Sequence, residues 1–321
     1  MNLLITGASG FVGQALAGCA LAAGHAVRPV LRPDAVARFR HLEACGQAVV
    51  IPDLRTDTVW SQALLGVDAV VHAAARVHVM HETADDALAA FRAVNVDATA
   101  HLARQAMQAG VRRFVFISSV KVVGESSQPG SALTELSPPR PEDAYGQSKL
   151  DAELALTELT RGSDMELVIV RPPLVYGPGV KGNFASMLAW VRKGVPLPLG
   201  AVHNQRSLLA LDNLVDFVLL CADRVRSPNA AHQVFMLADG EDVSTTGLLQ
   251  KVGRALQRPA RLLPVPVALM RVGAALLGKR ALADRLLGNL QVDTSKAHRF
   301  LGWTPPVSMD EQLASMLKQG D

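Results

Sequence analysis

The stretch "LLITGASGFVGQALA", residues 3–17, decides the fold, because it joins an apolar run to a glycine-rich turn and an alanine-rich helical pattern. Its three glycines are spaced G-x-x-G-x-x-G. A side chain on such a turn would keep a pyrophosphate away, and the free amides at a helix N-terminus bind phosphate oxygens. The stretch therefore predicts a turn that binds a dinucleotide. The contacts expected from it are Gly7, Gly10, Phe11, Val12 and Gly13.

Beyond this turn, the first half of the chain alternates short apolar runs with segments of helix length. Runs such as "AVVHAAA", "FVFISS" and "LVIVRP" indicate βαβ units and a parallel sheet buried on both faces. We therefore predict an α/β protein with a doubly wound parallel sheet of the Rossmann type over residues 1–170. Prolines and glycines become more frequent after this point. We expect residues 171–321 to form a smaller substrate-binding region, partly interleaved with the first.

The composition favours a globular protein with a large core, since 49% of the 321 residues are hydrophobic and 19% are charged. The formal charge of +3 comes from 32 basic and 29 acidic residues. That balance, without a basic run interleaved with aromatics, argues against a nucleic-acid partner. Cys19, Cys45 and Cys221 are odd in number and widely spaced. This predicts neither disulfides nor a metal site and favours the reducing cytoplasm.

Two apolar stretches bear on membrane association. The N-terminal run ends at Thr6 and has no basic leader, so we interpret it as a strand rather than a signal peptide. The run over residues 265–288 is interrupted by Arg271, Lys279 and Arg280, whereas a transmembrane helix needs about 20 nearly uninterrupted apolar residues. We expect no membrane insertion, and a helix on the membrane surface is the alternative for this segment.

The end of the second predicted strand bears on which dinucleotide is bound. An acidic residue there would bind the adenosine ribose hydroxyls, but "HAVRPVLRPD" places Leu31 and Arg32 at this point. A guanidinium suits the 2′-phosphate of NADP. We therefore favour NADP over NAD as the cofactor. In the alternative, Arg32 is solvated and the protein does not discriminate between the two.

Further cofactor contacts are expected after the third and fourth strands, because ligands lie at the carboxyl ends of strands in such sheets. After the third strand, "VIPDLRT" offers Asp53 and Leu54 to the adenine. The fourth strand is followed by small side chains that allow close approach to the cofactor: Ala73, Ala74 and Ala75. We interpret His72 as a packing residue, and His78 and Met80 as part of either the substrate pocket or a loop.

A tyrosine and a lysine in "DAYGQSKLDAE", residues 143–153, carry the expected chemistry. Tyr145 and Lys149 are four residues apart and share one face of a predicted helix. An ammonium beside a phenol, with an oxidised nicotinamide nearby, lowers the phenol pKa towards neutrality, which suits a group that exchanges a proton with a secondary alcohol. The apolar run in "FVFISSVKVVGE" is followed by two serines, and Ser119 would present its hydroxyl at the edge of the sheet. We predict that Ser119, Tyr145 and Lys149 are catalytic.

Taken together, these motifs resemble those of a known enzyme family. The segments "TGASGFVG", "AVNVDAT", "ISSVKVVGE", "YGQSK", "VRPPLVYGPG", "NQRSLLALDNLVD" and "DTSKAHRFLGW" span nearly the whole chain. They are similar to the extended short-chain dehydrogenases/reductases, in the branch of nucleotide-sugar epimerases and dehydratases. The resemblance implies an NAD(P)-dependent cytoplasmic enzyme with a UDP-sugar substrate. Family members often form homodimers, and the alanine-rich segment 96–109 is compatible with that.

The resemblance also implies roles for particular residues. The serine five places before Gly124 is the catalytic one, and the asparagine in "AVNV" lies near the active site. An asparagine in a glycine-rich loop and the arginine in "NQRS" match positions that hold the diphosphate, which both could bind through charge-assisted hydrogen bonds. The cofactor contacts implied are Asn95, Tyr145, Lys149 and Pro172, and the substrate contacts are Ser119, Asn183, Arg206 and Arg285.

Departures from the family pattern bear on the reaction. Dehydratases of this branch carry an Asp-Glu pair after the catalytic hydroxyl to move protons, whereas Val120 and Lys121 stand here. Without that acid–base pair we expect no dehydration. A non-catalytic protein that only senses dinucleotides would lack the tyrosine, so Tyr145 argues against this alternative.

Two oxidoreductive activities at C4 of a UDP-hexose remain. The lack of an acidic residue at Leu31 and the strings "HAAARVHVM", "SSVKVVGE" and "GNLQVDTSK" favour a 4-ketoreductase. Val123 and Leu174 stand where many epimerases have Tyr and Asn. We therefore expect reduction of a UDP-4-keto-6-deoxy-N-acetylhexosamine in surface polysaccharide synthesis. A UDP-glucose or UDP-N-acetylglucosamine 4-epimerase is the alternative, and steroid-like or flavonoid-like alcohols are further candidate substrates.

Overall fold

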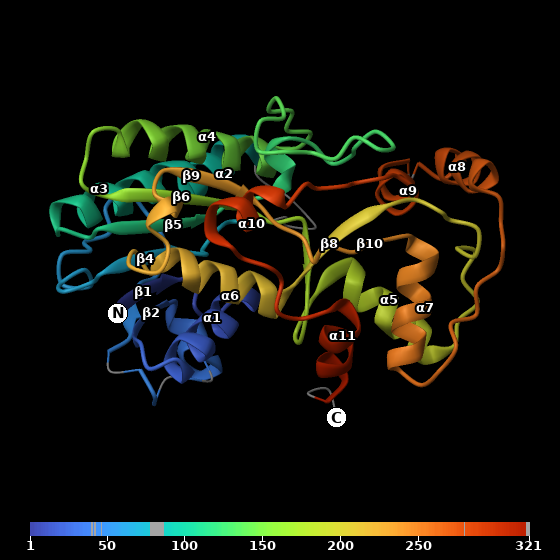
Figure 1. Cartoon of the computed structure of the whole chain (residues 1–321), viewed down its shortest axis with the longest axis horizontal. Helices are drawn as coiled ribbons and strands as arrows, with labels where there is room; N and C mark the ends of the chain where they lie inside the picture. The colour runs from blue at the N-terminus through green and yellow to red at the C-terminus, as the bar shows by residue number, and fades with distance from the viewer. Residues whose placement is uncertain (40, 42, 46, 78–86, 279, 319–321) are drawn as a thin grey trace.

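A parallel sheet of seven strands forms the centre of the computed structural model, in the order β3-β2-β1-β4-β5-β6-β9 (Figure 1). The structure describes residues 1–321 except 40, 42, 46, 78–86, 279 and 319–321. The strand order reverses between β1 and β4, which is where sheets of this kind bind ligands. The strands are β1 (Asn2–Thr6), β2 (Ala26–Leu31), β3 (Val49–Val50), β4 (Ala69–His72), β5 (Arg113–Ile117), β6 (Glu166–Arg171) and β9 (Gln233–Met236).

Helices cover both faces of this sheet because its strands point apolar side chains in both directions (Figure 1). In β1, Leu3 and Ile5 pack into one core with α1 and α6, whereas Leu4 packs into the other with α3 and α4. Each such buried side chain contributes roughly 1.5–3 kcal/mol. The predicted doubly wound α/β fold is confirmed. The covering helices are α1 (Phe11–Ala22), α6 (Leu211–Ala222), α2 (Ala87–Arg92), the π-helical η2 (Ala93–Ala98), α3 (Thr99–Gln108) and α4 (Ala144–Thr160).

A second, smaller sheet lies beside the first, with the order β10-β8-β7 (Figure 1). In it, β7 (Leu174–Tyr176) runs parallel to β8 (Arg206–Ala210), and β10 (Asp242–Val243) runs antiparallel to β8. Its own core gathers apolar side chains from several helices. The helices of this part are α5 (Gly182–Lys193), α7 (Thr245–Ala255), α8 (Val267–Leu276), α9 (Arg280–Leu287) and α11 (Met309–Lys318).

The two parts alternate along the chain. After β8, the chain returns to the large sheet as α6 and β9, and α10 (Ser295–Leu301) later packs against β9. The division into two domains at residue 170 stays a prediction. Short 3₁₀ helices occur at η1 (Pro33–Arg38), η3 (Val120–Val122) and η4 (Pro228–Ala230).

The apolar segment 265–288 folds into α8 and α9. Helix α8 packs Met270 and Ala274 on the smaller core and exposes Leu269, Val272 and Leu276. Within the part of the chain that the structure describes, no helix combines the length and the apolar character needed to cross a membrane.

Candidate active site

The glycine loop between β1 and α1 is packed so tightly that two of its glycines, Gly7 and Gly13, leave no room for a side chain. Gly7 has a φ of +68°, and a Cβ on it would lie 2.8 Å from the backbone of Ala74. A Cβ on Gly13 would collide with the carbonyl group of Gly7. Helix α1 begins after Gly10 without a side-chain cap, so the amides of its first turn remain available for a phosphate. The loop therefore fits a dinucleotide pyrophosphate.

A cleft of about 500 Å³ opens over this loop, at the carboxyl ends of β1, β2 and β4. Its position beside the reversal of strand order is the one expected for a nucleotide in a doubly wound sheet. The structure brings most of the predicted cofactor residues to its lining: Gly7, Gly10, Phe11, Val12, Gly13, Arg32, Asp53, Leu54, Ala73, Ala74 and Ala75.

A buried chain of hydrogen bonds supports the cleft from below. Thr6 Oγ1 accepts a hydrogen bond from the amide of Ala74 and bonds His72 Nδ1 at 2.8 Å. His72 Nε2 in turn bonds Thr99 Oγ1 at 2.9 Å. Burial, and to a lesser extent the charge of Lys149, lowers the pKa of His72 to about 3. His72 is therefore neutral and joins β1, β4 and α3, in line with the packing role expected for it.

Arg32 lies on the rim of the cleft, where it faces both solvent and an acidic neighbour. Its Nε is 3.7 Å from the carboxylate of Asp34, and both side chains are exposed. Asp34 also accepts a hydrogen bond from Arg38 at 2.8 Å. The positive charge expected to attract a 2′-phosphate is thus partly offset by a carboxylate two residues away.

Helix α4 carries the tyrosine and the lysine and is tied to the end of β5. Lys149 is buried, and its Nζ donates to the carbonyl of Ile117 at 2.7 Å. The same ammonium lies 4.3 Å from the centre of the Phe116 ring. The ring of Tyr145 packs edge-on against Phe91, with 6.3 Å between centroids. Lys149 thus connects the helix to the strand end that leads directly into the predicted catalytic serine.

Burial dominates the titration of both groups. It lowers the pKa of Lys149 to about 7, although the charge of Glu153 opposes the shift. It raises the pKa of Tyr145 to about 12, and the charge of Asp143 adds to this. The lowered phenol pKa expected beside an oxidised nicotinamide stays a prediction, because in the ligand-free protein the loss of water around the phenolate dominates the pKa of Tyr145.

The two serines after β5 have different partners. Ser118 is buried and donates to Glu153 Oε1 at 2.5 Å, and Glu153 forms a buried ion pair with Arg171. Ser119 is half-buried, and its Oγ accepts a hydrogen bond from the amide of Lys121 at 3.2 Å. Ser118 therefore anchors the strand end to α4, while the hydroxyl of Ser119 lines a second cavity.

Asn95 occupies the π-helical turn η2 and is buried. Its side-chain carbonyl accepts from the amide of Arg76 at 2.8 Å, and its amide donates to the carbonyl of Arg76 and to Ser148 Oγ. Ser148 also donates to the carbonyl of Tyr145 at 2.8 Å. Asn95 thus positions the segment after β4 against helix α4, and direct contact with the cofactor stays a prediction.

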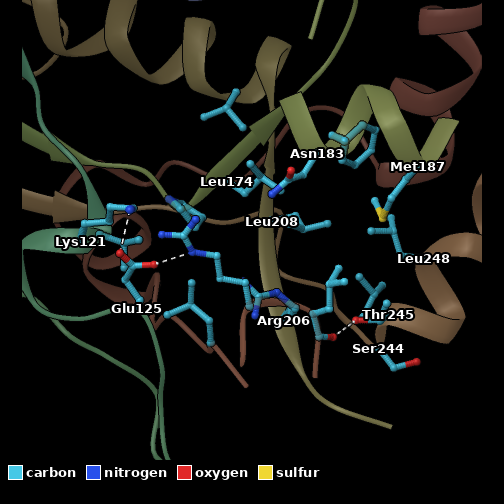
Figure 2. A pocket seen from close by; sticks show the side chains of 18 of the residues that line it. Lys121, Glu125, Leu174, Asn183, Met187, Arg206, Leu208, Ser244, Thr245 and Leu248 are labelled. Carbon is cyan, nitrogen blue, oxygen red and sulfur yellow. Dashed lines mark hydrogen bonds and ion pairs between the residues drawn. The ribbon is translucent and has the colours of Figure 1, made fainter. Parts of the chain in front are cut away.

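The second cavity has a volume of about 370 Å³ and lies between the segment that follows β5 and the strands of the smaller sheet. Figure 2 shows residues that line it. Its apolar wall includes Leu174 and Leu208, from β7 and β8. Three of the expected cofactor contacts, Pro172, Tyr145 and Lys149, line neither the cleft nor this cavity. The carbonyl of Pro172 instead accepts a hydrogen bond from the amide of Val120 at 2.9 Å. All four predicted substrate residues line this cavity, namely Ser119, Asn183, Arg206 and Arg285.

Glu125 is the feature of this cavity that sequence reasoning missed. Its carboxylate lies 2.7 Å from Lys121 Nζ and 3.2 Å from Arg285 Nε (Figure 2). Lys121 also contacts Asp143, the residue that caps α4, at 2.5 Å. The i, i+4 spacing of Lys121 and Glu125 was the one signal in the sequence. The contact with Arg285 joins residues 160 positions apart. His78 and Met80 lie outside the described residues.

Comparison with known proteins agrees with this geometry. Residues 3–235 match the model of the NAD dependent epimerase/dehydratase family. The chain is 42% identical to a UDP-glucose 4-epimerase of Vibrio cholerae, over 97% of this chain and 92% of that protein. It is 27% identical to an N-acetyl-alpha-D-glucosaminyl-diphospho-ditrans,octacis-undecaprenol 4-epimerase of Escherichia coli O157:H7, over 99% and 94% of the two chains. A Bacillus cereus UDP-glucuronic acid 4-epimerase, solved with UDP-glucuronic acid and NAD, has a similar fold, with a TM-score of 0.78, 22% identity and coverage of 99% and 98%.

The expected preference for NADP is not supported. The matching family is described by its dependence on NAD. In this chain the guanidinium of Arg32 is solvent-exposed and faces Asp34. An arginine after β2 is therefore insufficient to assign the phosphorylated cofactor.

Proposed function

We propose that this chain, which belongs to the NAD dependent epimerase/dehydratase family, is a UDP-hexose 4-epimerase. The observation that carries the proposal is its likeness, over nearly its whole length, to the Vibrio cholerae UDP-glucose 4-epimerase. Such an enzyme oxidises C4 to a ketone and then reduces it from the opposite face. The cleft over the glycine loop and the cavity beside Ser119 offer separate places for cofactor and sugar.

The cleft would hold NAD, which when bound supplies a hydride acceptor and donor. The first-turn amides of α1 would bind its pyrophosphate, since no side chain caps the start of this helix at Gly10. Asp53 and Leu54 would meet the adenosine at the ends of the neighbouring strands. We favour NAD over NADP because Asp34 stands beside Arg32 at the end of the cleft.

Proton transfer at C4 is assigned to Tyr145, with Ser119 bonding the same oxygen. During oxidation Tyr145 takes the proton of the C4 hydroxyl, and during reduction it returns that proton. Lys149, with a pKa near 7, changes charge close to physiological pH. Its ammonium form favours the phenolate one helical turn away, so this lysine tunes the tyrosine.

The cavity beside Ser119 would hold the nucleotide sugar. Arg206 is partly buried and donates to the carbonyl of Gly288 at 3.1 Å, which orients its guanidinium. Arg206, Arg285 and Asn183 can then bind the diphosphate through charge-assisted hydrogen bonds. The apolar side chains of Leu174 and Leu208 exclude water from the sugar side.

A 4-ketoreductase of UDP-4-keto-6-deoxy-N-acetylhexosamines is the second candidate. Strand β2 ends with Leu31 and is followed by an arginine, so no acidic residue stands at this strand end. This weakens retention of a permanently bound NAD. A reductase must exchange its cofactor at every turnover, so weak retention would suit it. Surface polysaccharide synthesis would be the setting of either activity.

Product analysis separates the two candidates. Purified protein is incubated with UDP-glucose or UDP-N-acetylglucosamine and NAD, and the sugars are identified after hydrolysis. We expect the C4 epimer to form without net accumulation of NADH. Turnover of the UDP-4-keto-6-deoxy sugar alone, and only with added NADPH, would contradict the epimerase and support the reductase.

A further inference from the structure

The second cavity contains one carboxylate among three cations. Its charged lining residues are Lys121, Arg206, Arg285 and Glu125, all of them described by the structure. Glu125 is largely enclosed, with 15% of its side chain exposed, and it contacts Lys121 on one oxygen and Arg285 on the other. Burial lowers the pKa of Arg206, and the charge of Glu125 opposes this shift. Glu125 is therefore the shared counter-ion of the whole cavity.

The charges of this lining match a dianionic diphosphate. Three cations and one carboxylate give a formal charge of 3 − 1 = +2. Two of the cations, Arg206 and Arg285, are arginines, which suit phosphate oxygens because of their planar donor geometry. A nucleoside diphosphate joined to an uncharged sugar would thus neutralise the cavity, whereas a sugar with its own carboxylate would leave one negative charge unmatched.

Two carboxylates contact the side chain of Lys121, whose backbone amide bonds the hydroxyl of Ser119. The amide of Lys121 donates to Ser119 Oγ, so Lys121 directly adjoins the group expected to bind the C4 oxygen. Its ammonium is already shared by two carboxylates, Glu125 at 2.7 Å and Asp143 at 2.5 Å. A further carboxylate on the sugar would meet this excess of negative charge in a cavity lined largely by apolar side chains, where like charges repel more strongly than in bulk water.

We propose that Glu125 is a specificity-determining residue that restricts the substrate to nucleotide sugars without a charge on the hexose and rejects uronates. The inference rests on the proposed function, because it assumes that a nucleotide sugar occupies this cavity. Glu125 acts by occupying the ammonium of Lys121, which without Glu125 would still contact Asp143 but would be more available to a uronate carboxylate.

The test compares UDP-glucose with UDP-glucuronic acid in the wild-type chain and in Glu125→Gln. The ratio of kcat/KM for the two substrates is measured with NAD, and the ratio of Kd by calorimetry. We expect wild type to prefer UDP-glucose by about 100-fold or more, and Glu125→Gln to reduce that preference by at least about 10-fold, in the range typical of a hydrogen-bonded charge. Glu125→Asp keeps the charge and should keep most of the preference.

Glu142→Gln is the matched control. Glu142 lies outside the lining of this cavity, although its carboxylate accepts a hydrogen bond from the amide of Glu125 at 3.4 Å. Removing its charge should leave the substrate ratio unchanged. Equal use of both sugars by wild type, or a ratio that Glu125→Gln leaves unchanged, would overturn the role of Glu125. Failure to epimerise either sugar would instead count against the proposed function, and the Kd ratios would still decide the role of Glu125.

Discussion

At the scale of single residues, burial determines the pKa values of Tyr145 and Lys149, which their spacing in the sequence does not reveal. Their spacing correctly places both on one helix, with Lys149 buried one turn behind Tyr145. Burial then raises the pKa of Tyr145 to about 12 and lowers that of Lys149 to about 7. The pair is therefore adjusted for catalysis only when further positive charge lies beside the phenol, since a phenolate is otherwise costly in this environment.

Removing the phenolic hydroxyl tests the assigned proton transfer. Tyr145→Phe keeps the ring that packs against Phe91, so the fold should survive. We expect kcat to fall by about 10²–10⁴, the usual effect of losing a general acid or base, while the Kd for UDP-glucose changes little. Steady-state rates and calorimetry measure the two quantities. A near-normal kcat would remove Tyr145 from the reaction and revive the non-catalytic dinucleotide sensor.

The lowered pKa of Lys149 also predicts how stability depends on pH. Between pH 7 and pH 10.5, the folded lysine is largely neutral, whereas the unfolded lysine is still protonated. The unfolded state then binds more protons, so the free energy of unfolding rises with pH in this window.

Lys149→Met isolates this contribution, because the variant lacks the titrating group. Relative to the variant, wild type should gain roughly 2–3 kcal/mol of unfolding free energy between pH 7 and pH 9.5, since one pKa unit corresponds to about 1.4 kcal/mol. Urea unfolding of the ligand-free proteins at the two pH values measures the difference. Parallel behaviour of wild type and variant would show that Lys149 stays protonated in the fold.

At the scale of elements, the position of Tyr145 depends on how α4 begins. The carboxylate of Asp143 accepts a hydrogen bond from the amide of Gly146 at 2.7 Å and also pairs with Lys121. A Cβ on Gly146 would lie 2.9 Å from the carbonyl of Lys121, so the helix start packs directly on η3. The cap and this contact together fix the first turn, which contains the tyrosine.

Two substitutions at Asp143 separate capping from charge. Asp143→Ala removes the cap and should lower the free energy of unfolding by about 1 kcal/mol, whereas Asn caps helices nearly as well as Asp. We expect kcat to fall further in Asp143→Ala than in Asp143→Asn, because only the first frees the helix start. Chemical denaturation and steady-state rates supply the measurements. Equal losses in both variants would show that the charge shared with Lys121 matters more than the cap.

The sequence predicts those elements whose signals are local. The glycine loop follows from spacing alone because Gly7 needs a positive φ and Gly13 needs backbone contact. Helix α4, which carries Tyr145 and Lys149, can likewise be predicted from the sequence, because these residues are near neighbours along the chain. The ion pair of Glu125 with Arg285 and the contacts of Asn95 with Ser148 join distant positions. Such pairings depend on tertiary packing, so they could not be derived from periodicity.

At the scale of the whole molecule, the chain passes from the large sheet to the smaller sheet and back again. Helix α6 packs against α1 and β5, and β9 completes the large sheet beside β6. Phe217 of α6 and Phe235 of β9 lie in the same core as Leu3 and Ile5 of β1. The first part of the chain therefore depends on segments that lie between β8 and β10, two strands of the smaller sheet.

This interleaving predicts that the first part does not fold by itself. A fragment of residues 1–178 retains β1 to β7 but lacks α6 and β9, which leaves one face of the sheet covered by α1 alone and the edge of β6 unpaired. We expect the whole chain to unfold in urea with a cooperative transition, and the fragment to show no such transition and no near-UV circular dichroism. Calorimetry should also detect no NAD binding to the fragment. A fragment that unfolds cooperatively and binds NAD would show instead that the nucleotide part is an autonomous domain, as the division at residue 170 supposes.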